Sequence, residues 1–292
     1  MHFFDDAFAQ KVNLLCIMCC NFTAWTKFRF FKMHTVISIS LAGGQGKTTV
    51  VLFVARLLAF QGHTVLLVDA DPQSSLTTFL GHTVEPDNPT LLEVLKKQVN
   101  TEDGIYKTQY DNLFLIPSDD ALDNVQDYLA GSGTGAFTLK KRLASVAKLF
   151  DYCIVDAPPQ RSQICLTVIG ASDALTIPIE TSVKGLQSLI RTLELITELR
   201  DDQEAFNGEI LGVIPFRDRW VGLRRTTESE SNIESMKQIS TQWLESDLVL
   251  PSIRESEKFK QAINKGLTLH QMHQDDLAYP IEVIVEKIKG LK

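Results

Sequence analysis

The sequence is poor in cysteine, with five cysteines among 292 residues, and these five do not form a complete ligand set. Cys16, Cys19 and Cys20 lie close together, but no second pair follows at the spacing that a zinc site requires. Cys153 and Cys165 lie in apolar segments typical of a protein core. The pattern argues against a disulfide scaffold, and reduced thiols are expected.

Long uninterrupted apolar runs are also missing. The apolar stretch at residues 12–25 is broken by Asn13 and Asn21 and is shorter than the roughly 20 residues that a membrane-spanning helix needs. We therefore expect no stable membrane anchor. Residues 1–32 differ in composition from the rest and are expected to form an N-terminal extension outside the fold. An upstream translation start is the favoured explanation, with an apolar targeting segment and a thiol or metal site as alternatives.

Basic residues do not outnumber acidic ones: the chain has 29 Lys and Arg residues and 36 Asp and Glu residues. The net charge of −7 argues against a protein that coats nucleic acid with its whole surface, so any contact with DNA must use a local patch. The hydrophobic content of 44% is sufficient for one sizeable core. Residues 33–292 are therefore predicted to form a single domain.

From Thr35 onward, apolar runs of strand length alternate with segments of helical period, which indicates repeated strand–helix units. The predicted strands are 36–41, 64–69, 112–117, 152–157, 174–179, 209–215 and 248–250, and the predicted helices are 48–60, 121–129, 139–149, 183–199, 233–244 and a surface helix at 279–292. The expected fold class is α/β: a doubly wound, mostly parallel sheet with helices on both faces.

The segment LAGGQGKTT, residues 41–49, follows the first predicted strand and opens the first predicted helix. Its glycines allow the backbone to wrap a phosphate group, and the helix N-terminus favours negative charge. Lys47 would reach the β- and γ-phosphates, and the hydroxyl of Thr48 would bind Mg²⁺. The segment therefore predicts a P-loop NTPase that binds ATP with Mg²⁺.

A strict GxxxxGK[ST] motif needs glycine at the position of Leu41, so the match is to the deviant form KGGxGK[ST]. VDADPQ at residues 68–73 and VDAPP at residues 155–159 each end a predicted strand. In these three segments the chain resembles the ParA/MinD family of deviant Walker A ATPases, over roughly residue 33 to the C-terminus. The resemblance implies a slow ATPase that a partner stimulates, and a homodimer with ATP sandwiched between its subunits.

The resemblance also implies roles for individual residues. Asp71 would position the attacking water, Asp156 would hold Mg²⁺ through a water molecule, and Asp69 would support this shell or only orient the loop. Thr48, Asp71 and Asp156 are thus the predicted metal residues, and Lys47 and Asp71 are predicted to be catalytic. The predicted ATP-binding residues are Gly43, Gly44, Gln45, Gly46, Lys47, Thr48, Thr49, Pro215 and Arg217.

Ala42 departs from the family, whose members usually place at that position a signature lysine that reaches the partner's phosphates. Another cation must then neutralise the γ-phosphate. Lys184, after the fifth predicted strand, is our candidate for this catalytic role, and Arg161, after the DAPP segment, is the alternative. Absence of the signature lysine also resembles the carboxysome-distribution branch of the family, although one substitution does not separate that branch from a divergent ParA.

Family members bind DNA non-specifically in the ATP state and release it after hydrolysis, which a small ParB- or McdB-like adaptor stimulates. Arg224, Arg225, Arg254, Lys258 and Lys260 are the predicted DNA-binding residues, although interleaved glutamates also allow an ordinary mixed-charge surface. The expected function is the positioning of a cargo, such as a carboxysome-like body, a plasmid or a chromosome, by a cytoplasmic protein on the nucleoid.

Two other functions remain as alternatives. A MinD-like membrane regulator needs a basic amphipathic C-terminal helix, and Glu282 and Glu286 weaken that interpretation. An iron–sulfur P-loop relative of the nitrogenase iron protein bridges its cluster with two cysteines per subunit, for which Cys153 and Cys165 are poorly placed. A metabolic ligase would need a substrate site, and the sequence shows none.

Overall fold

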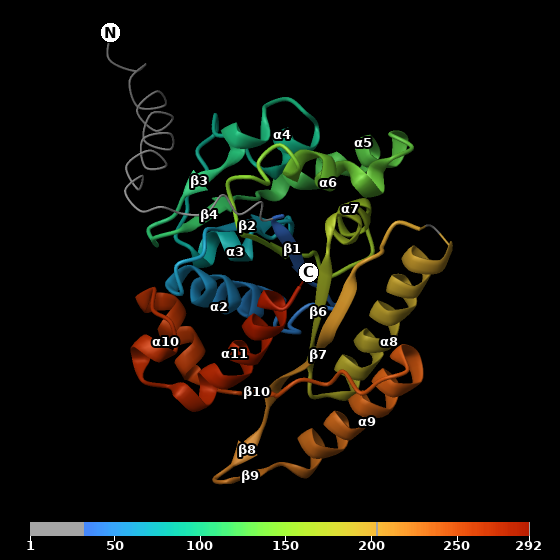
Figure 1. The fold of residues 1–292 in the computed structure, drawn as a ribbon. Helices are drawn as coiled ribbons and strands as arrows, with labels where there is room; N and C mark the ends of the chain where they lie inside the picture. The colour runs from blue at the N-terminus through green and yellow to red at the C-terminus, as the bar shows by residue number, and fades with distance from the viewer. Residues whose placement is uncertain (1–31, 203, 292) are drawn as a thin grey trace. The chain divides into compact units, whose positions relative to one another are not determined.

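The computed structural model describes residues 32–202 and 204–291, so the predictions for residues 1–31 lie outside the described residues (Figure 1). The described residues form an eight-stranded sheet in the order β10-β7-β6-β1-β5-β2-β4-β3. All pairs are parallel except β3 with β4. The strands are β1 His34–Ser38, β2 Val65–Asp69, β3 Tyr106–Lys107, β4 Leu113–Ile116, β5 Tyr152–Asp156, β6 Ala174–Glu180, β7 Glu209–Asp218 and β10 Ile253–Arg254.

Helices cover both faces of this sheet (Figure 1). One face carries α2 Lys47–Phe60, α3 Ser75–Phe79, α10 Glu257–Lys265 and α11 Asp275–Lys289. The other carries α4 Leu91–Leu95, α5 Gln126–Gly131, α6 Thr138–Leu143, α7 Gln163–Ala171, α8 Val183–Thr197 and α9 Thr227–Leu244. Short turns of helix lie at Thr101–Gly104, Asp120–Val125, Gly135–Phe137, Glu198–Asp202 and His270–Met272, and a two-stranded hairpin joins β8 Trp220–Val221 to β9 Arg224–Arg225.

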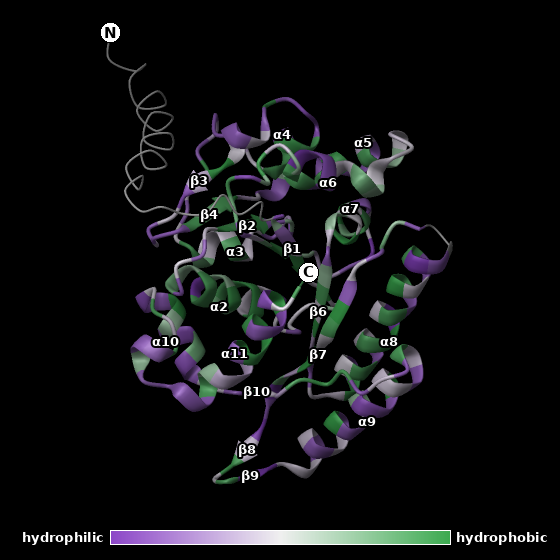
Figure 2. Cartoon of the chain, viewed as in Figure 1, coloured by the Kyte–Doolittle hydropathy of each residue, from purple (hydrophilic) through white to green (hydrophobic). Residues whose placement is uncertain are grey.

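Alternating side chains of the strands feed two separate apolar cores. In β5, Cys153 and Val155 pack into the core under α7, whereas Ile154 faces the core under α2. Both faces of a central strand are buried, which explains the continuous apolar runs in the sequence. Figure 2 shows the apolar sides of the helices turned toward the sheet. The predicted doubly wound, mostly parallel α/β fold is confirmed.

Two element predictions were wrong in detail. The strand expected at 248–250 makes a single isolated bridge, Val213 with Val249, and the edge strand is instead Ile253–Arg254. The helix expected at 139–149 ends at Leu143, because the backbone N–H groups of Ser145 and Val146 bond three residues back and tighten the chain into turns. None of the helices in the described part of the chain is both long and apolar enough to cross a bilayer.

Candidate nucleotide-binding site

The acidic residues that the sequence singled out meet at the carboxyl end of the central strands. Asp69 ends β2 and Asp156 ends β5, and the two residues are direct partners in the parallel ladder. Ser38, at the end of β1, is the partner of Asp156 on its other side. The loop that leaves β1 therefore begins at the same edge of the sheet as both carboxylates, where open α/β sheets bind their ligands.

The loop from β1 to α2 owes its shape to two glycines. Gly44 and Gly46 have φ values of 81° and 95°, in the region that residues with a side chain rarely occupy. A Cβ atom on Gly46 would lie 2.5 Å from the ring of Phe216, so the loop also packs too closely there for any side chain. Helix α2 begins directly afterwards at Lys47. The helix N-terminus and the loop thus form a cradle suited to an anion.

Lys47 points back over this loop. Its Nζ donates to the backbone carbonyls of Ser40 at 3.2 Å and of Ala42 at 3.1 Å. Burial lowers the pKa of Lys47, and the charges of Asp156 and Asp71 partly oppose that shift. The ammonium group is therefore held in the cradle by neutral oxygens, which phosphate oxygens can replace with stronger, charge-assisted hydrogen bonds.

Thr48 and Asp156 form the core of a cation site. The Thr48 hydroxyl donates to Asp156 Oδ2 at 2.6 Å, whereas Asp156 Oδ1 is buried and has no hydrogen-bond partner among the described residues. Burial, and then the neighbouring charge of Asp69, raise the pKa of Asp156. A cation beside this carboxylate would favour its ionised form and supply the missing partner.

These residues fit Mg²⁺. The ion takes a few protein oxygens and completes an octahedron with phosphates and waters, and Thr48 with Asp156 offers such a set. No cluster of three or more His, Cys, Asp or Glu residues that could hold a metal occurs within residues 32–202 and 204–291. Mg²⁺ at Thr48 and Asp156 would take its remaining ligands from phosphates and waters.

Asp69 and Asp71 have different surroundings. Asp69 is buried, and Oδ2 accepts from Thr77 N at 2.8 Å and Thr77 Oγ1 at 2.7 Å. Burial raises the pKa of Asp69 to about 6, although these hydrogen bonds oppose the shift. Asp71 lies at the rim, donates its N–H to Asp69 at 3.2 Å and accepts from Gln73 N at 3.0 Å. The Asp69 side chain is thus engaged with Thr77 and with the backbone of Asp71, whereas Asp71 is partly exposed.

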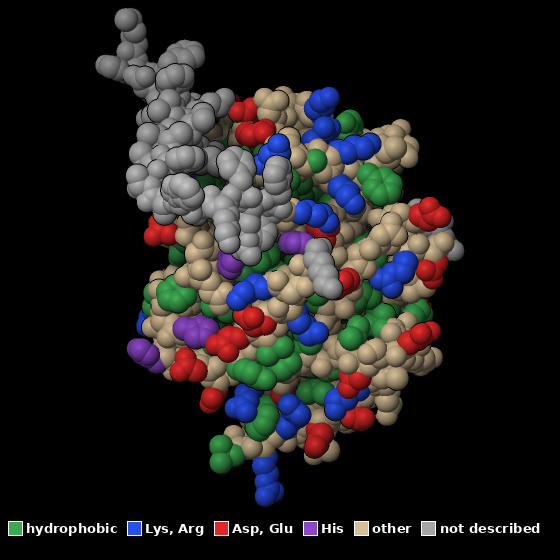
Figure 3. Space-filling view, viewed as in Figure 1, with side chains coloured by type: hydrophobic (Ala, Val, Ile, Leu, Met, Phe, Trp, Pro, Cys, Tyr) green, Lys and Arg blue, Asp and Glu red, His purple; other side chains and the backbone are tan. Residues whose placement is uncertain are grey.

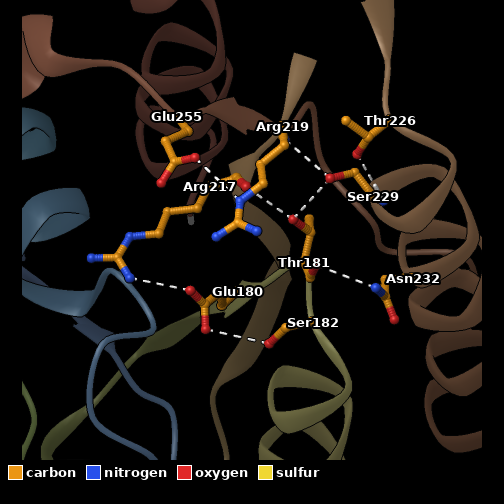
Figure 4. Close-up of polar contacts among 9 residues, drawn as sticks. All are labelled: Glu180, Thr181, Ser182, Arg217, Arg219, Thr226, Ser229, Asn232 and Glu255. Atoms are coloured by element: carbon orange, nitrogen blue, oxygen red, sulfur yellow. Dashed lines mark hydrogen bonds and ion pairs between the residues drawn. The ribbon is translucent and has the colours of Figure 1, made fainter. Parts of the chain in front are cut away.

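Sequence analysis missed a polar network on the other rim of the site. The buried side chain of Gln45 accepts from Glu180 N at 2.9 Å through Oε1, so it ties the phosphate loop to the end of β6. Figure 4 shows how the network continues, with Glu180 paired to Arg217 at 3.1 Å and the Thr181 hydroxyl donating to the Arg217 carbonyl at 3.0 Å.

The same network reaches α9. The hydroxyls of Thr181 and Ser229 lie 3.3 Å apart, and Asn232 donates to the Thr181 carbonyl at 3.2 Å (Figure 4). Ser229 N donates to Thr226, which caps the helix. The cap is a signal that the sequence did contain, since threonine before an acidic, helical segment is typical of a helix start. The pairing of Thr181 with Ser229 has no such local signal.

Lys184 and Arg161 lie at the carboxyl edge in different states. Ser182 caps α8 by accepting from Gly185 N, which places the exposed Lys184 in the first turn of that helix. No acidic partner of Lys184 occurs in the described part of the chain. Arg161 is instead held by two hydrogen bonds to Glu198, at 2.7 and 2.6 Å. The structure leaves Lys184 the more available of the two cations.

The predicted adenine-side residues and the two core cysteines lie in different surroundings. Pro215 and Arg217 lie near the end of β7, and Arg217 adopts a φ of 55° and pairs with Glu180. Cys153 and Cys165 are buried free thiols, and burial raises the pKa of Cys165 to about 12. Their burial does not suit an iron–sulfur cluster bridged between subunits.

The predicted DNA-binding residues fall into three settings. Arg225 pairs with buried Asp218 at 3.0 Å, and Arg254 stacks on Trp220 with its guanidinium 3.9 Å from the ring centre. Lys260 pairs with Glu257 and Lys258 with Gln261 on α10, while Arg224 is exposed on β9. Arg225 and Arg254 thus contact the same Trp220 ring, Arg224 lies on the same hairpin, and Lys258 and Lys260 lie on α10.

The chain is similar in sequence to several known proteins. Residues 34–205 match the model of an AAA domain family. The chain is 51% identical to the maintenance of carboxysome distribution protein A of Synechococcus elongatus, over 88% of this chain and 99% of that protein. It is 30% identical to the sporulation initiation inhibitor protein Soj of Bacillus subtilis, over 63% of this chain and 75% of Soj.

Two solved structures are also similar to this chain. An ATP complex of a Cyanothece McdA variant is 50% identical, covers 90% of this chain and 98% of its own, and has a TM-score of 0.84. A cobyrinic acid a,c-diamide synthase from Mycobacterium smegmatis, with an ATP analogue and magnesium, is 25% identical over 80% of this chain and 92% of its own, with a TM-score of 0.66.

Proposed function

The chain belongs to the ParA-like partition ATPases, in the branch of the carboxysome-distribution protein McdA, and on that premise we propose that it uses Mg-ATP to position an intracellular cargo. The observation that supports ATP use is the cradle itself: Lys47 at the head of α2, beside Thr48 bonded to an Asp156 that keeps one buried oxygen unpartnered. Residues 33–292 carry this activity, and a carboxysome-like body is the cargo that the relatives favour.

In this proposal the chain's residues position the nucleotide more than they react with it. The backbone of residues 43–49 and Lys47 bind the phosphates, and Pro215 and Arg217 line the adenine side. Thr48 and Asp156 would hold Mg²⁺, which would neutralise charge on the phosphates. Asp71 orients the attacking water from the rim. Phosphoryl transfer depends mainly on such positioning and charge neutralisation, so turnover is slow.

We assign the missing trans-acting cation to Lys184. It is exposed in the first turn of α8, and no acid in the described residues competes for it, whereas Arg161 is held by Glu198. If a second subunit faces this edge, the Lys184 ammonium group would lie near the γ-phosphate that the second subunit binds. Lys184→Ala should abolish ATP-dependent dimerisation, measured by light scattering, and Arg161→Ala should leave it unchanged. Normal dimerisation of Lys184→Ala would remove the assignment.

The ATP-bound dimer is proposed to bind DNA non-specifically and to release it when a small adaptor stimulates hydrolysis. Dimerisation doubles a small set of phosphate contacts, so binding becomes strong only with ATP. This gives a nucleotide-timed association with the nucleoid. A MinD-like membrane regulator is less favoured, because the relatives named above are a carboxysome-distribution protein and a sporulation initiation inhibitor.

The decisive experiment compares DNA binding in the two nucleotide states. Asp71→Ala is expected to bind ATP and dimerise but to release no phosphate, so it should remain on random-sequence duplex DNA at low salt. Wild-type protein with ADP should not bind the same DNA. Equal binding with ADP and ATP would contradict the switch, and undiminished phosphate release by Asp71→Ala would contradict the role of that residue.

A further inference from the structure

The hairpin of β8 and β9 exposes apolar side chains at its tip. Leu223 and Val221 are the most exposed large apolar residues among those described, at 94% and 75%. They flank Gly222, whose φ of 60° forms the turn. Figure 3 shows hydrophobic and basic atoms together where Figure 1 places this hairpin. Single exposed apolar residues are ordinary, but two at one protruding tip suggest a binding element.

The base of the hairpin is fixed by a buried carboxylate. Asp218, at the end of β7, is fully buried and accepts from Arg225 Nε at 3.0 Å. It also accepts from Trp220 Nε1 at 2.9 Å and from the Ser252 hydroxyl at 2.6 Å. A tip held on so rigid a base loses little conformational entropy when it binds a partner.

The charges around the tip indicate the kind of partner. Arg224 lies next to Leu223, and Arg254 stacks on Trp220 at the base. Both are exposed, and neither has an acidic partner in the described residues. Arg219, in contrast, is paired to Glu255 at 3.2 Å. The nearby acids Glu228 and Glu230 lie on the first turn of α9. Because their carboxylates would repel an anionic partner, such a partner can contact only the tip and the β10 side of the hairpin.

We propose that this hairpin tip is a wedge that enters the minor groove of duplex DNA, with Arg224 and Arg254 on the flanking phosphates. The inference rests on the DNA binding in the proposed function and names the element that performs it. Minor-groove proteins insert leucine and similar side chains between base steps, and the groove is only about 6 Å wide. Only the two turn residues, Gly222 and Leu223, need to enter the groove, and a wedge that makes no hydrogen bond to a base edge carries no direct sequence readout.

A lipid surface fits the tip less well. Two short side chains bury far less hydrocarbon than a single acyl chain, which by itself gives only marginal membrane binding. Arginine and leucine together also occur at contacts between protein copies. Both alternatives make predictions that the following experiment separates.

The test uses the full chain with ATP and random-sequence duplex DNA that carries 2-aminopurine. Val221→Ser with Leu223→Ser should weaken binding about tenfold, because apolar contact in the groove is lost. The salt dependence of binding should stay the same, whereas Arg224→Ala should reduce its slope by about 1. Wild-type protein should raise the 2-aminopurine fluorescence through unstacking, and the double variant should not.

Phe60→Ser is the matched control. Phe60 is 61% exposed at the end of α2, away from the phosphate loop, so its loss should change DNA affinity by less than about twofold. If the Val221→Ser, Leu223→Ser variant binds DNA as tightly as the wild type, the wedge proposal is wrong but the proposed function stands. If the tip variant no longer co-sediments with anionic vesicles as the wild type does, the tip binds a lipid surface. If the tip variant no longer forms the ATP-dependent dimer, the tip contacts a second copy of the chain. Either result also overturns the wedge proposal. Wild-type protein that binds no DNA removes the proposed function itself.

Discussion

Thr48 is the residue on which the proposed cation site depends most directly. Its hydroxyl is the hydrogen-bond partner of a buried carboxylate whose other oxygen has none. The position of Asp156 at the end of a strand was predictable from the sequence, because the apolar run before it and the DAPP segment mark where the strand ends. Its direct pairing with Asp69, which helps to raise its pKa, is decided by the register of two strands.

Thr48→Val should lower Mg-dependent ATP turnover at least tenfold, because the hydroxyl ligand is lost. The free energy of unfolding should fall by about 1–3 kcal/mol, since Asp156 is left without a hydrogen bond. Thr48→Ser keeps the hydroxyl and should retain both. Phosphate release and urea denaturation measure the two effects. Equal turnover of the Val and Ser variants would show that the hydroxyl does not serve the reaction.

Gly46 offers a second test at one residue. Gly46→Ala should destabilise the protein by about 1–3 kcal/mol, because φ is 95° and the new Cβ would lie 2.5 Å from Phe216. Gly43→Ala is the control, since a Cβ added there would have no other atom within 4 Å and its φ is not left-handed. Thermal unfolding compares the two variants. Equal melting temperatures would contradict the close packing of the loop.

The hairpin of β8 and β9 is the element that sequence patterns did not find. Its strands have two residues each, too few to show an alternation, and its anchor Asp218 resembles any surface acid between two arginines. Burial of that carboxylate depends on Ser252, which arrives from a segment 34 residues away. Such an anchor is visible only once the chain is folded.

Asp218→Ala should therefore disorder the hairpin more than the domain. Removal of a buried, hydrogen-bonded partner of Arg225 is expected to cost about 3 kcal/mol of unfolding free energy, and less if water reaches the partly exposed arginine. Amide exchange in residues 219–226 should accelerate. Glu255→Ala breaks an exposed pair and should cost less than about 1 kcal/mol. Unchanged exchange in the first variant would refute the anchor.

The whole molecule should respond to its nucleotide as a ligand-stabilised fold. A ligand that binds only the native state at about 100 times its Kd stabilises it by about 2.7 kcal/mol. Mg-ATP should therefore raise the melting temperature, EDTA should reduce the effect, and Lys47→Ala should abolish it. If ATP also brings two copies together, the shift should grow with protein concentration. An identical shift in Lys47→Ala would place the nucleotide elsewhere.

The fold class could be predicted from the sequence alone, and so could the position of the phosphate loop between the first strand and the first long helix. Central strands buried on both faces must read as continuous apolar runs, and a phosphate loop must join such a strand to a helix, so both are encoded locally. Boundaries were less certain: the helix at residue 139 ends at Leu143, where its hydrogen bonds tighten.

Contacts between residues that lie far apart in the sequence could not be predicted from it. Gln45 bonds to Glu180, 135 residues away, and Thr181 meets Ser229 on α9. The folded structure also shows that Arg161 is held by Glu198 while Lys184 is exposed, and that Leu223 is exposed next to Arg224. Such contacts follow from strand register and helix packing, which no local pattern specifies.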